Sequence, residues 1–369
     1  MPAQGPDFVA IHLDAAVPRD QILALAAAAG VRTLHGSTSC RGAMINAGIG
    51  DAAEKSVGLF AIWDPDGDFG TACVSLGDDP EHAGADAARN ALLEAGRMGE
   101  APALVWVSSS PGSEERVLAG IQRVLGTGVP IVGGSCADND ISGKWAVFDA
   151  NRVEGAGVTV SVLFPSTDVS MSFQSGYAPT GTSGVITAAD GRRIIEIDGR
   201  PALEIYDGWT SGSLANSTDA SVQILSQSTF APLGRQIENV ASVPFYLLVH
   251  PAMAHPDGSI DVFANVAVGE ELHLMTGSEN SLCSRAGRVA SQAREDLDSS
   301  EPVAGALVVY CAGCMLAVEH RMKEVASAVD TALDGAPFMG VFTFGEQGPV
   351  LGSANRHGNL MISCITFAA

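Results

Sequence analysis

The sequence predicts an α/β fold of two related halves, in which mixed sheets are covered by helices in a layered sandwich. Short apolar strand patterns alternate with amphipathic helical patterns along the chain. ALVWVSSS (103–110), a helix and VPIVGGS (129–135) form one strand–helix–strand unit. The same order returns as GALVVYCAG (305–313), a helix and APFMGVF (336–342), and VRTLHGSTS (31–39) is a weaker third copy. This repetition indicates an internal duplication.

The first half begins with a helix over residues 20–30, which is rich in alanine, follows Pro18 and ends at Gly30. A strand (31–36) and a polar loop (37–42) come next. Residues 59–77 predict a hairpin, because two apolar stretches flank the turn sequence Asp64-Pro65-Asp66-Gly67. The remaining predicted elements are a helix over 80–98, the strand 103–110, a helix over 113–126 with Ser113 as its N-cap, and the strand 129–135.

Strand patterns dominate the middle of the chain. Residues 144–165 predict two strands joined by a polar turn, and short strands continue over 171–206 with a helix beginning at Pro201. The polar segment 211–229 is the predicted boundary, which gives domains at 27–210 and 211–367. The second half then has predicted strands at 242–253, 259–275, 305–313 and 336–349, and predicted helices at 281–298 and 314–335.

The composition excludes several classes of function. The chain has 42 acidic and 20 basic residues, a net charge of −22, which argues against binding nucleic acid or an anionic membrane surface. The first residues show no basic region before an apolar core, and no apolar run is long enough to span a bilayer. The seven cysteines are scattered, so we expect no disulfide framework and a cytoplasmic location.

Three predicted strands end in glycine followed by small polar or acidic residues. They are Gly36-Ser37-Thr38, Gly133-Gly134-Ser135 and Gly345-Glu346. Ligands of α/β proteins bind beyond the carboxyl ends of strands, so convergence of these ends would form a pocket lined by hydroxyls and a carboxylate. In the alternative interpretation the glycines serve tight turns and close packing, and composition by itself favours this alternative.

Two thiol motifs suggest other chemistry. Cys311 and Cys314 form a CxxC at a predicted helix start, where a helix N-terminus lowers a thiol pKa and favours a redox role. A zinc site is not expected, since no second ligand pair has the required spacing. Cys136 after Gly-Gly-Ser is a candidate hydrolase nucleophile, although the Gly-x-Ser-x-Gly pattern is absent. Small buried residues are the alternative explanation of these positions and the favoured one, and we expect a protein that is not an enzyme.

A haem protein would need an axial ligand, usually histidine, in an apolar pocket. The candidates that adjoin apolar strands or glycine loops are His35, His250, His255 and His273. Nothing in the sequence distinguishes one of them, and a lone histidine on an apolar strand is more often a structural residue.

The ordered set VPIVGGSCAD, DGRPALEIY, FMGVFTFGEQGP and GSANRHGNLM resembles the FIST family, with its FIST N and FIST C domains, over about Val31 to Ile365. The resemblance implies a bacterial sensory domain that binds a small molecule, such as an amino acid or related metabolite. Some relatives resemble haem-binding nitric oxide sensors. The chain carries no recognisable output domain, so the resemblance implies a separate partner such as a histidine kinase or a cyclic-di-GMP enzyme.

The resemblance also singles out Gly345-Glu346 with His357 and Asn359 as the best site candidate, in which a carboxylate would anchor a ligand amine. The sequence departs from the family pattern at three places where the resemblance implies ligand contacts. Cys314 replaces an arginine, Gly358 separates the usual His-Asn pair, and Cys40-Arg41 stands where Gly-Glu is common. These departures imply either a changed ligand or an inactive site.

Overall fold

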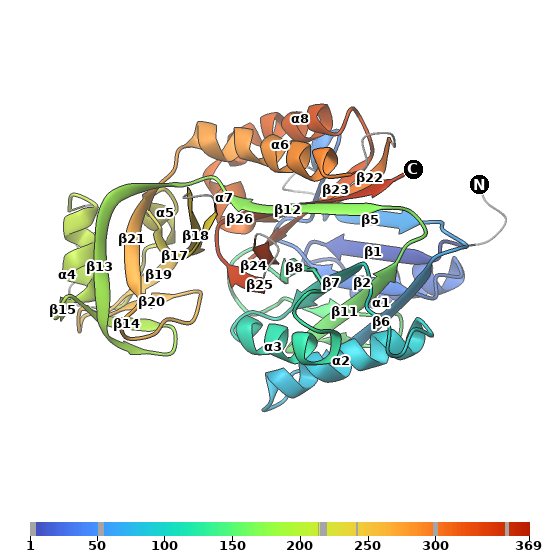
Figure 1. Cartoon of the computed structure of the whole chain (residues 1–369), viewed down its shortest axis with the longest axis horizontal. Coiled ribbons are helices and arrows are strands. Elements are labelled where there is room, and N and C mark those ends of the chain that lie inside the picture. Colours follow the sequence, from blue (N-terminus) through green and yellow to red (C-terminus); the bar gives the residue numbers. More distant parts are fainter. Residues whose placement is uncertain are drawn as a thin grey trace.

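The computed structural model describes residues 5–50, 55–212, 214, 220–240, 243–297, 302–350 and 354–369. These residues form four sheets, and the mixed α/β class predicted from the sequence is confirmed. Figure 1 shows a layered body on the right and a smaller domain of strands on the left.

Two mixed sheets of six strands face one another at the centre of the body. The β7 sheet has the order β25 (Ala354–Gly358), β24 (Glu346–Val350), β8 (Ile131–Ser135), β7 (Leu104–Ser109), β11 (Gly157–Phe164), β6 (Asp68–Ser75). The β22 sheet has the order β12 (Val169–Ser175), β26 (Met361–Ala368), β22 (Val303–Cys311), β23 (Phe338–Thr343), β3 (Ala43–Ile45), β4 (Gly48–Ile49).

Helices cover the outer face of each sheet, which completes an αββα sandwich (Figure 1). The helices are α2 (Pro80–Glu94) and α3 (Glu114–Leu125) on the β7 sheet, and α6 (Glu279–Glu295), α7 (Ala312–Ala317), a 3-10 turn (Glu319–Arg321) and α8 (Met322–Ala332) at the β22 sheet. Successive side chains of β7 point to opposite faces of the sheet and so contribute to two hydrophobic layers. Leu104 and Trp106 face the other sheet, whereas Val105 and Val107 pack under α2 and α3.

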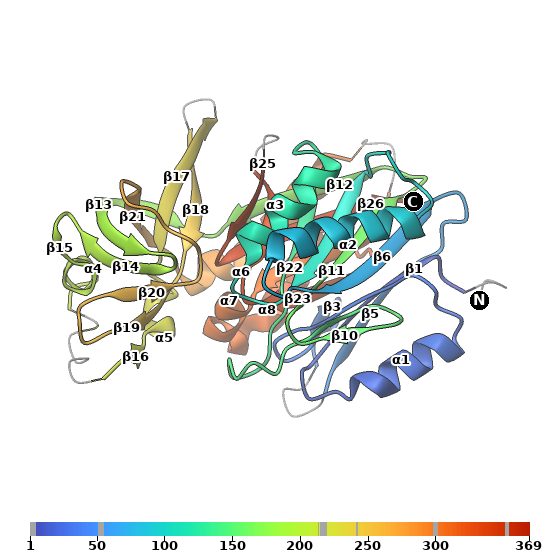
Figure 2. The same ribbon diagram turned by 90° about the horizontal axis from the view of Figure 1, so that it is seen from below.

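A third sheet lies beside the sandwich and carries α1 (Arg19–Ala28) (Figure 2). Its order is β10 (Val153–Glu154), β9 (Val147–Phe148), β2 (Leu34–Thr38), β1 (Phe8–Leu13), β5 (Val57–Ile62). The predicted repeat is evident here, because β1–β2, β7–β8 and β22–β23 are each a parallel pair joined through helix.

The two halves of the chain exchange strands. β24, from the second half, pairs with β8 in the β7 sheet, and β3, from the first half, pairs with β23 in the β22 sheet. Each sheet of the sandwich is therefore completed by the other half, which ties the halves into one body.

The smaller domain, called here the β13 domain, spans residues 178–276. Its strands run in the order β16 (Val222–Gln223), β19 (Pro251–Ala254), β20 (Ile260–Val262), β14 (Arg193–Ile197), β13 (Ala178–Asp190), β21 (Glu271–Thr276), β17 (Leu233–Val240), β18 (Val243–Val249), with β15 (Arg200–Pro201) beside β14, and its helices are α4 (Ala202–Trp209) and α5 (Leu225–Ser228). Both predicted stretches, 27–210 and 211–367, contribute to this one spatial unit.

Three local predictions were wrong. β5 and β6 are strands, but they do not form the predicted hairpin: β5 pairs with β1 and β6 with β11, so the turn at residues 64–67 passes between two sheets. The predicted helix 314–335 is broken into α7, a 3-10 turn and α8. The predicted strand 336–349 is two strands, β23 and β24, which lie in different sheets because β23 pairs with β22 and β24, beginning at Glu346, pairs with β8.

Candidate functional site

The glycine-containing strand ends lie together at one edge of the body. The Thr38 carbonyl oxygen accepts from the Ala137 amide at 3.1 Å, which joins the ends of β2 and β8. The Ser135 carbonyl oxygen accepts from the Phe344 amide, also at 3.1 Å, which joins β8 to the end of β23. The three strand ends therefore lie side by side through backbone hydrogen bonds.

A cavity of about 470 Å³ lies just beyond these ends, where the body meets the β13 domain. We call it the strand-end cavity. Its walls come from the loops after β2, β8, β22 and β23 and from the facing surface of the β13 domain. The residues used below are Trp145, Phe230, Phe263, Phe344, Thr229, His250, Cys40, Cys311, Asp138, Glu114, Arg192 and Asn359. This position, beyond carboxyl ends of sheet strands, is where α/β proteins bind ligands.

The predicted glycines serve close packing. A Cβ atom on Gly36 would stand 1.9 Å from the Phe148 ring, and one on Gly134 would stand 2.3 Å from Thr343 Cγ2. A Cβ on Gly345 would stand 2.4 Å from His357 Cε1, and one on Gly133 would meet the Val107 carbonyl oxygen at 1.9 Å. None of the four lines the strand-end cavity as described, so they bring the strands together behind it.

The hydroxyls of the predicted site also have partners inside the protein. Ser37 Oγ contacts His12 Nδ1 at 2.8 Å, and Thr38 Oγ1 accepts from the Ala146 amide at 3.0 Å. Ser135 Oγ donates to Glu114 Oε1 at 2.7 Å. These side chains are buried and position the loops that form the cavity wall.

Glu346 is fully buried and stands behind the cavity wall. Its Oε1 accepts from Thr343 Oγ1 at 2.7 Å and its Oε2 accepts from the Met361 amide at 3.0 Å. Burial, followed by the nearby Cys311 thiol, raises the pKa of Glu346 well above its ordinary value. Glu346 thus links β23, β24 and β26, and its carboxyl group favours the neutral form.

His357 and Asn359 lie at the end of the β25 strand but face different surroundings. His357 Nε2 lies 3.2 Å from the Phe263 carbonyl oxygen, which joins β25 to the β13 domain. Asn359 lines the cavity, and its Oδ1 accepts from the His250 amide at 3.2 Å. Its Nδ2 is buried with no hydrogen-bond partner in the described part of the chain. Of the ten predicted site residues, Asn359 is the one that lines this cavity.

Sequence reasoning missed most of the cavity wall. Trp145 and Phe344 meet edge to face, with ring centroids 6.1 Å apart, and Phe230 and Phe263 add further apolar surface from the β13 domain. Thr229 adds a polar group, with its Oγ1 3.5 Å from Nε2 of His250, which the sequence had indicated only as one of four candidate haem ligands. These residues lie far apart in the chain, so no spacing pattern could have grouped them.

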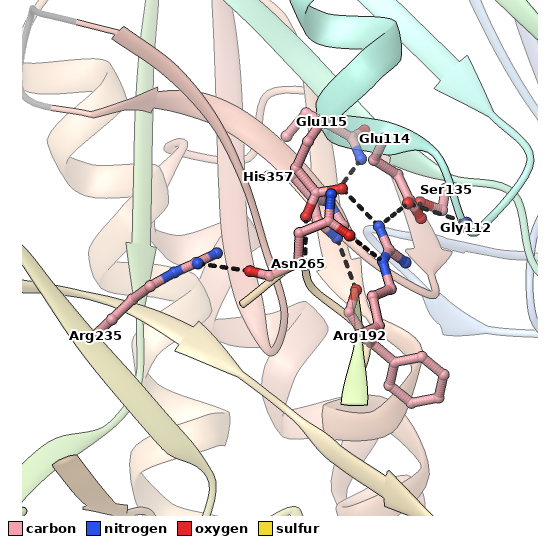
Figure 3. Close-up of polar contacts among 10 residues, drawn as sticks. Gly112, Glu114, Glu115, Ser135, Arg192, Arg235, Asn265 and His357 are labelled. Atoms are coloured by element: carbon pink, nitrogen blue, oxygen red, sulfur yellow. Dashed lines mark hydrogen bonds and ion pairs between the residues drawn. The ribbon is translucent and has the colours of Figure 1, made fainter. Parts of the chain in front are cut away.

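Glu114 and Arg192, which line the cavity, belong to an ion-pair network. Figure 3 shows its contacts. Arg192, in the turn between β13 and β14, donates through Nη2 to Glu114 and Glu115 at the start of α3, at 2.6 Å each. Glu115 Oε1 also accepts from the Asn265 amide at 2.8 Å. We call this the Arg192 network, and it fastens the β13 domain to the body.

Glu114 is almost completely buried, with its side chain 2% exposed. Burial raises its pKa, but the charges of His357 and Arg192 and the Ser135 hydrogen bond outweigh burial and hold it below the ordinary value. The same two charges lower the pKa of Glu115 against burial. Both carboxylates are therefore ionised at neutral pH, and they neutralise Arg192.

The thiol chemistry considered from the sequence is opposed by burial. All seven cysteines are free and buried. Burial raises the pKa of Cys311 and of Cys136 well above the ordinary thiol value, opposite to what an activated redox or nucleophilic cysteine needs. Among the described residues, no group of three or more His, Cys, Asp and Glu side chains could hold a metal ion, and no helix is long and apolar enough to cross a membrane.

Comparisons with known proteins agree with this architecture. The FIST N domain family matches residues 8–200, and the FIST C domain family matches residues 202–349. An uncharacterised protein of Mycobacterium bovis is 27% identical over 240 residues, 63% of this chain and 58% of that protein. An uncharacterised protein of Methanocaldococcus jannaschii is 26% identical over 153 residues, 42% of this chain and 26% of that protein.

The matched region spans 58% of the length of the first relative and 26% of the second, less than two thirds of either. The solved structure of PurLQS from Thermotoga maritima aligns with 82% of this chain and 72% of its own at 10% identity, with a TM-score of 0.21, too low to support an argument.

Proposed function

Because this chain belongs to the FIST family, whose domains are sensory domains of signal transduction, we propose that it is a sensor that binds a small polar metabolite in the strand-end cavity. The supporting observation is the buried Asn359 Nδ2, a donor without a partner in the wall of a 470 Å³ cavity. Cavities of this size hold small molecules, and an unused buried donor is costly unless a ligand accepts from it.

The cavity suits a zwitterion such as an amino acid. Asn359 Nδ2 would donate to the ligand carboxylate. The ligand amine would meet the aromatic faces of Trp145 and Phe344 and the acidic side of the cavity at Asp138, because a cation is attracted to both. The Arg192 guanidinium is already neutralised by two carboxylates, so it does not compete for the ligand.

Ligand binding would be read out as a shift between the body and the β13 domain. The cavity has walls from both, so a ligand that contacts both stabilises the closed arrangement over any other. A shift between the body and the β13 domain would change the surface of the protein, and a separate signalling protein would recognise that change. The expected partner is a histidine kinase or a cyclic-di-GMP enzyme.

Substituting Asn359→Asp tests the ligand contact. The change keeps the Oδ1 acceptor for the His250 amide and replaces the free donor with a carboxylate oxygen. A ligand found by thermal shift in a panel of amino acids and related metabolites should lose roughly tenfold or more in affinity, since a hydrogen bond to a charged group is worth about 1.5–3 kcal/mol. Isothermal titration would measure it.

The exposed Asn151→Asp is the matched control and should bind like the unmodified protein. Equal affinity of N359D and N151D would remove Asn359 from the ligand site. A panel in which no compound raises the melting temperature would contradict the metabolite proposal itself.

His250 favours a second candidate, a haem-based nitric oxide sensor. Burial lowers its pKa to about 4, so the imidazole is neutral at pH 7, the form that binds iron. Among the described histidines, it is the one that lines the strand-end cavity, and the aromatic walls supply the apolar surroundings that a haem needs. Haem would supply the iron that binds the gas, and His250 would hold it.

An absorption spectrum decides between the two candidates. Protein purified from cells supplied with a haem precursor should show a stoichiometric Soret band if haem binds, and His250→Ala should remove it, whereas His273→Ala in the β13 domain should keep it. A spectrum without the band excludes the haem candidate and leaves the metabolite sensor.

A further inference from the structure

A second hollow lies between β12 and β18, away from the strand-end cavity. It encloses about 1040 Å³ and has walls from α6, β12, β18 and the strands β24 and β25. Its apolar surface comes chiefly from Phe173, Tyr177, Phe245 and Tyr246, and Arg285 of α6 lines it with its charged side chain. We call it the Arg285 groove.

Arg285 makes no ion pair with any carboxylate in the described ranges, and among the several described arginines that share this feature it is the one that lines the groove. Its Nη2 donates to Gln174 Oε1, and its buried Nε has no hydrogen-bond partner among the described residues. Burial, followed by the charge of Arg288, lowers the pKa of the Arg285 guanidinium. With 42 acidic residues in the chain, a counter-ion would have been easy to provide.

The guanidinium is held in place without being neutralised. Gln174, which accepts from Arg285, itself donates through Nε2 to Ser172 Oγ at 3.2 Å on the same strand. These neutral groups orient the side chain but leave its charge available. A planar guanidinium binds a carboxylate well, and the aromatic residues around it offer flat apolar surface for the rest of a ligand.

We propose that the Arg285 groove binds a small organic monoanion, a carboxylate attached to a planar apolar body. Arg285 is the one arginine of the groove wall, and the wall also includes Asp296, whose Oδ1 accepts from Gln292 Nε2 at 3.0 Å. The site therefore matches a single negative charge placed at Arg285, since Arg288 is exposed on the next turn and is hydrogen-bonded to Ser284. The rest of the ligand packs between Phe173 and the tyrosines. This site is separate from the strand-end cavity and does not depend on the function proposed for it.

Titration calorimetry with 2-naphthoate tests the proposal, with the uncharged 2-naphthamide as the matched ligand. Naphthoate should bind one to one and at least tenfold more tightly than the amide. Arg285→Gln should abolish this preference, Arg285→Lys should restore part of it, and Arg288→Gln, on the same helix, should change naphthoate affinity less than threefold. Equal binding of acid and amide, equal effects of R285Q and R288Q, or no naphthoate binding would each overturn the proposal.

Thermal unfolding without ligand gives an independent check. Replacing Arg285 with glutamine breaks no ion pair with a carboxylate of the described residues. The melting temperature of R285Q should therefore equal or exceed that of the unmodified protein. Naphthoate should raise the melting temperature of the unmodified protein and not of R285Q. A clear drop in the melting temperature of unliganded R285Q would make Arg285 a structural residue and contradict the proposal.

Discussion

Replacing Arg192 with methionine should lower the free energy of unfolding by about 3 kcal/mol at pH 7. The substitution keeps the apolar stem but leaves Glu114, with its side chain 2% exposed, as an uncompensated buried carboxylate. Breaking a buried ion pair from one side costs about 3–5 kcal/mol, and the Ser135 and Gly112 donors that remain on Glu114 place the loss at the lower end. Chemical denaturation would measure it.

The neighbouring Arg193→Met is the control, because its ion pair with Asp261 is substantially exposed and surface pairs contribute little. Adding Glu114→Gln to R192M should recover part of the loss, since the buried charge is then gone. An R192M protein as stable as R193M would show that the Arg192 network does not fasten the β13 domain to the body.

The loss of unfolding free energy in R192M should also depend on pH, and it should become smaller as the pH falls. The pKa of Glu114 is lowered in the folded protein, so its contribution is fully present above the unfolded value of 4.5 and is lost as the pH falls through the folded value. The stability difference between R192M and the unmodified protein should shrink as the pH falls, because burial without a counter-ion raises the pKa of Glu114 in R192M whereas Arg192 helps to lower it in the unmodified protein. Unfolded carboxylates do not contribute to this difference, since the unfolded state is the same in both proteins.

Gly134→Ala should destabilise the protein by about 1–3 kcal/mol although it adds only one methyl group, the usual range for overpacking a close-packed core. The new Cβ would lie 2.3 Å from Thr343 Cγ2 and 2.9 Å from the Gly345 carbonyl oxygen, so β8 and the β23–β24 connection would have to separate. Thr343 cannot turn away without losing its hydrogen bond to Glu346.

Gly155→Ala is the matched control, since nothing lies within 4 Å of a Cβ there and its backbone φ is not in the left-handed region. Its stability should be unchanged or slightly raised by loss of unfolded-state entropy. If both alanine variants unfold at the same denaturant concentration, the glycines at the strand ends are not required for packing. That result would favour the other interpretation, in which these glycines let a ligand approach the backbone.

The candidate site shows where prediction from sequence stops. Close packing at the strand ends was the interpretation that composition favoured for the glycines after Leu34–His35 and Val132, because glycine permits close approach, whereas the convergence of the ends was only a condition for a pocket. The wall of the cavity did not follow, because Trp145, Thr229 and His250 come from three separate elements. The predicted anchor Glu346 lies behind the wall, since β24 pairs with β8 and turns that carboxyl group inward.

The sequence by itself determined the α/β class, the repeated strand–helix–strand units and the membership in a sensory family, because periodicity and ordered motifs are local properties of the chain. It also determined the acidic character, a net charge of −22, which argues against a nucleic-acid partner. The tertiary structure alone decided that β5 and β6 join different sheets, that each half completes the other's sheet, and that the cavity lies against the β13 domain. Pairing between distant strands depends on how sheets stack and bury surface, and neither turn signals nor residue spacing carry that information.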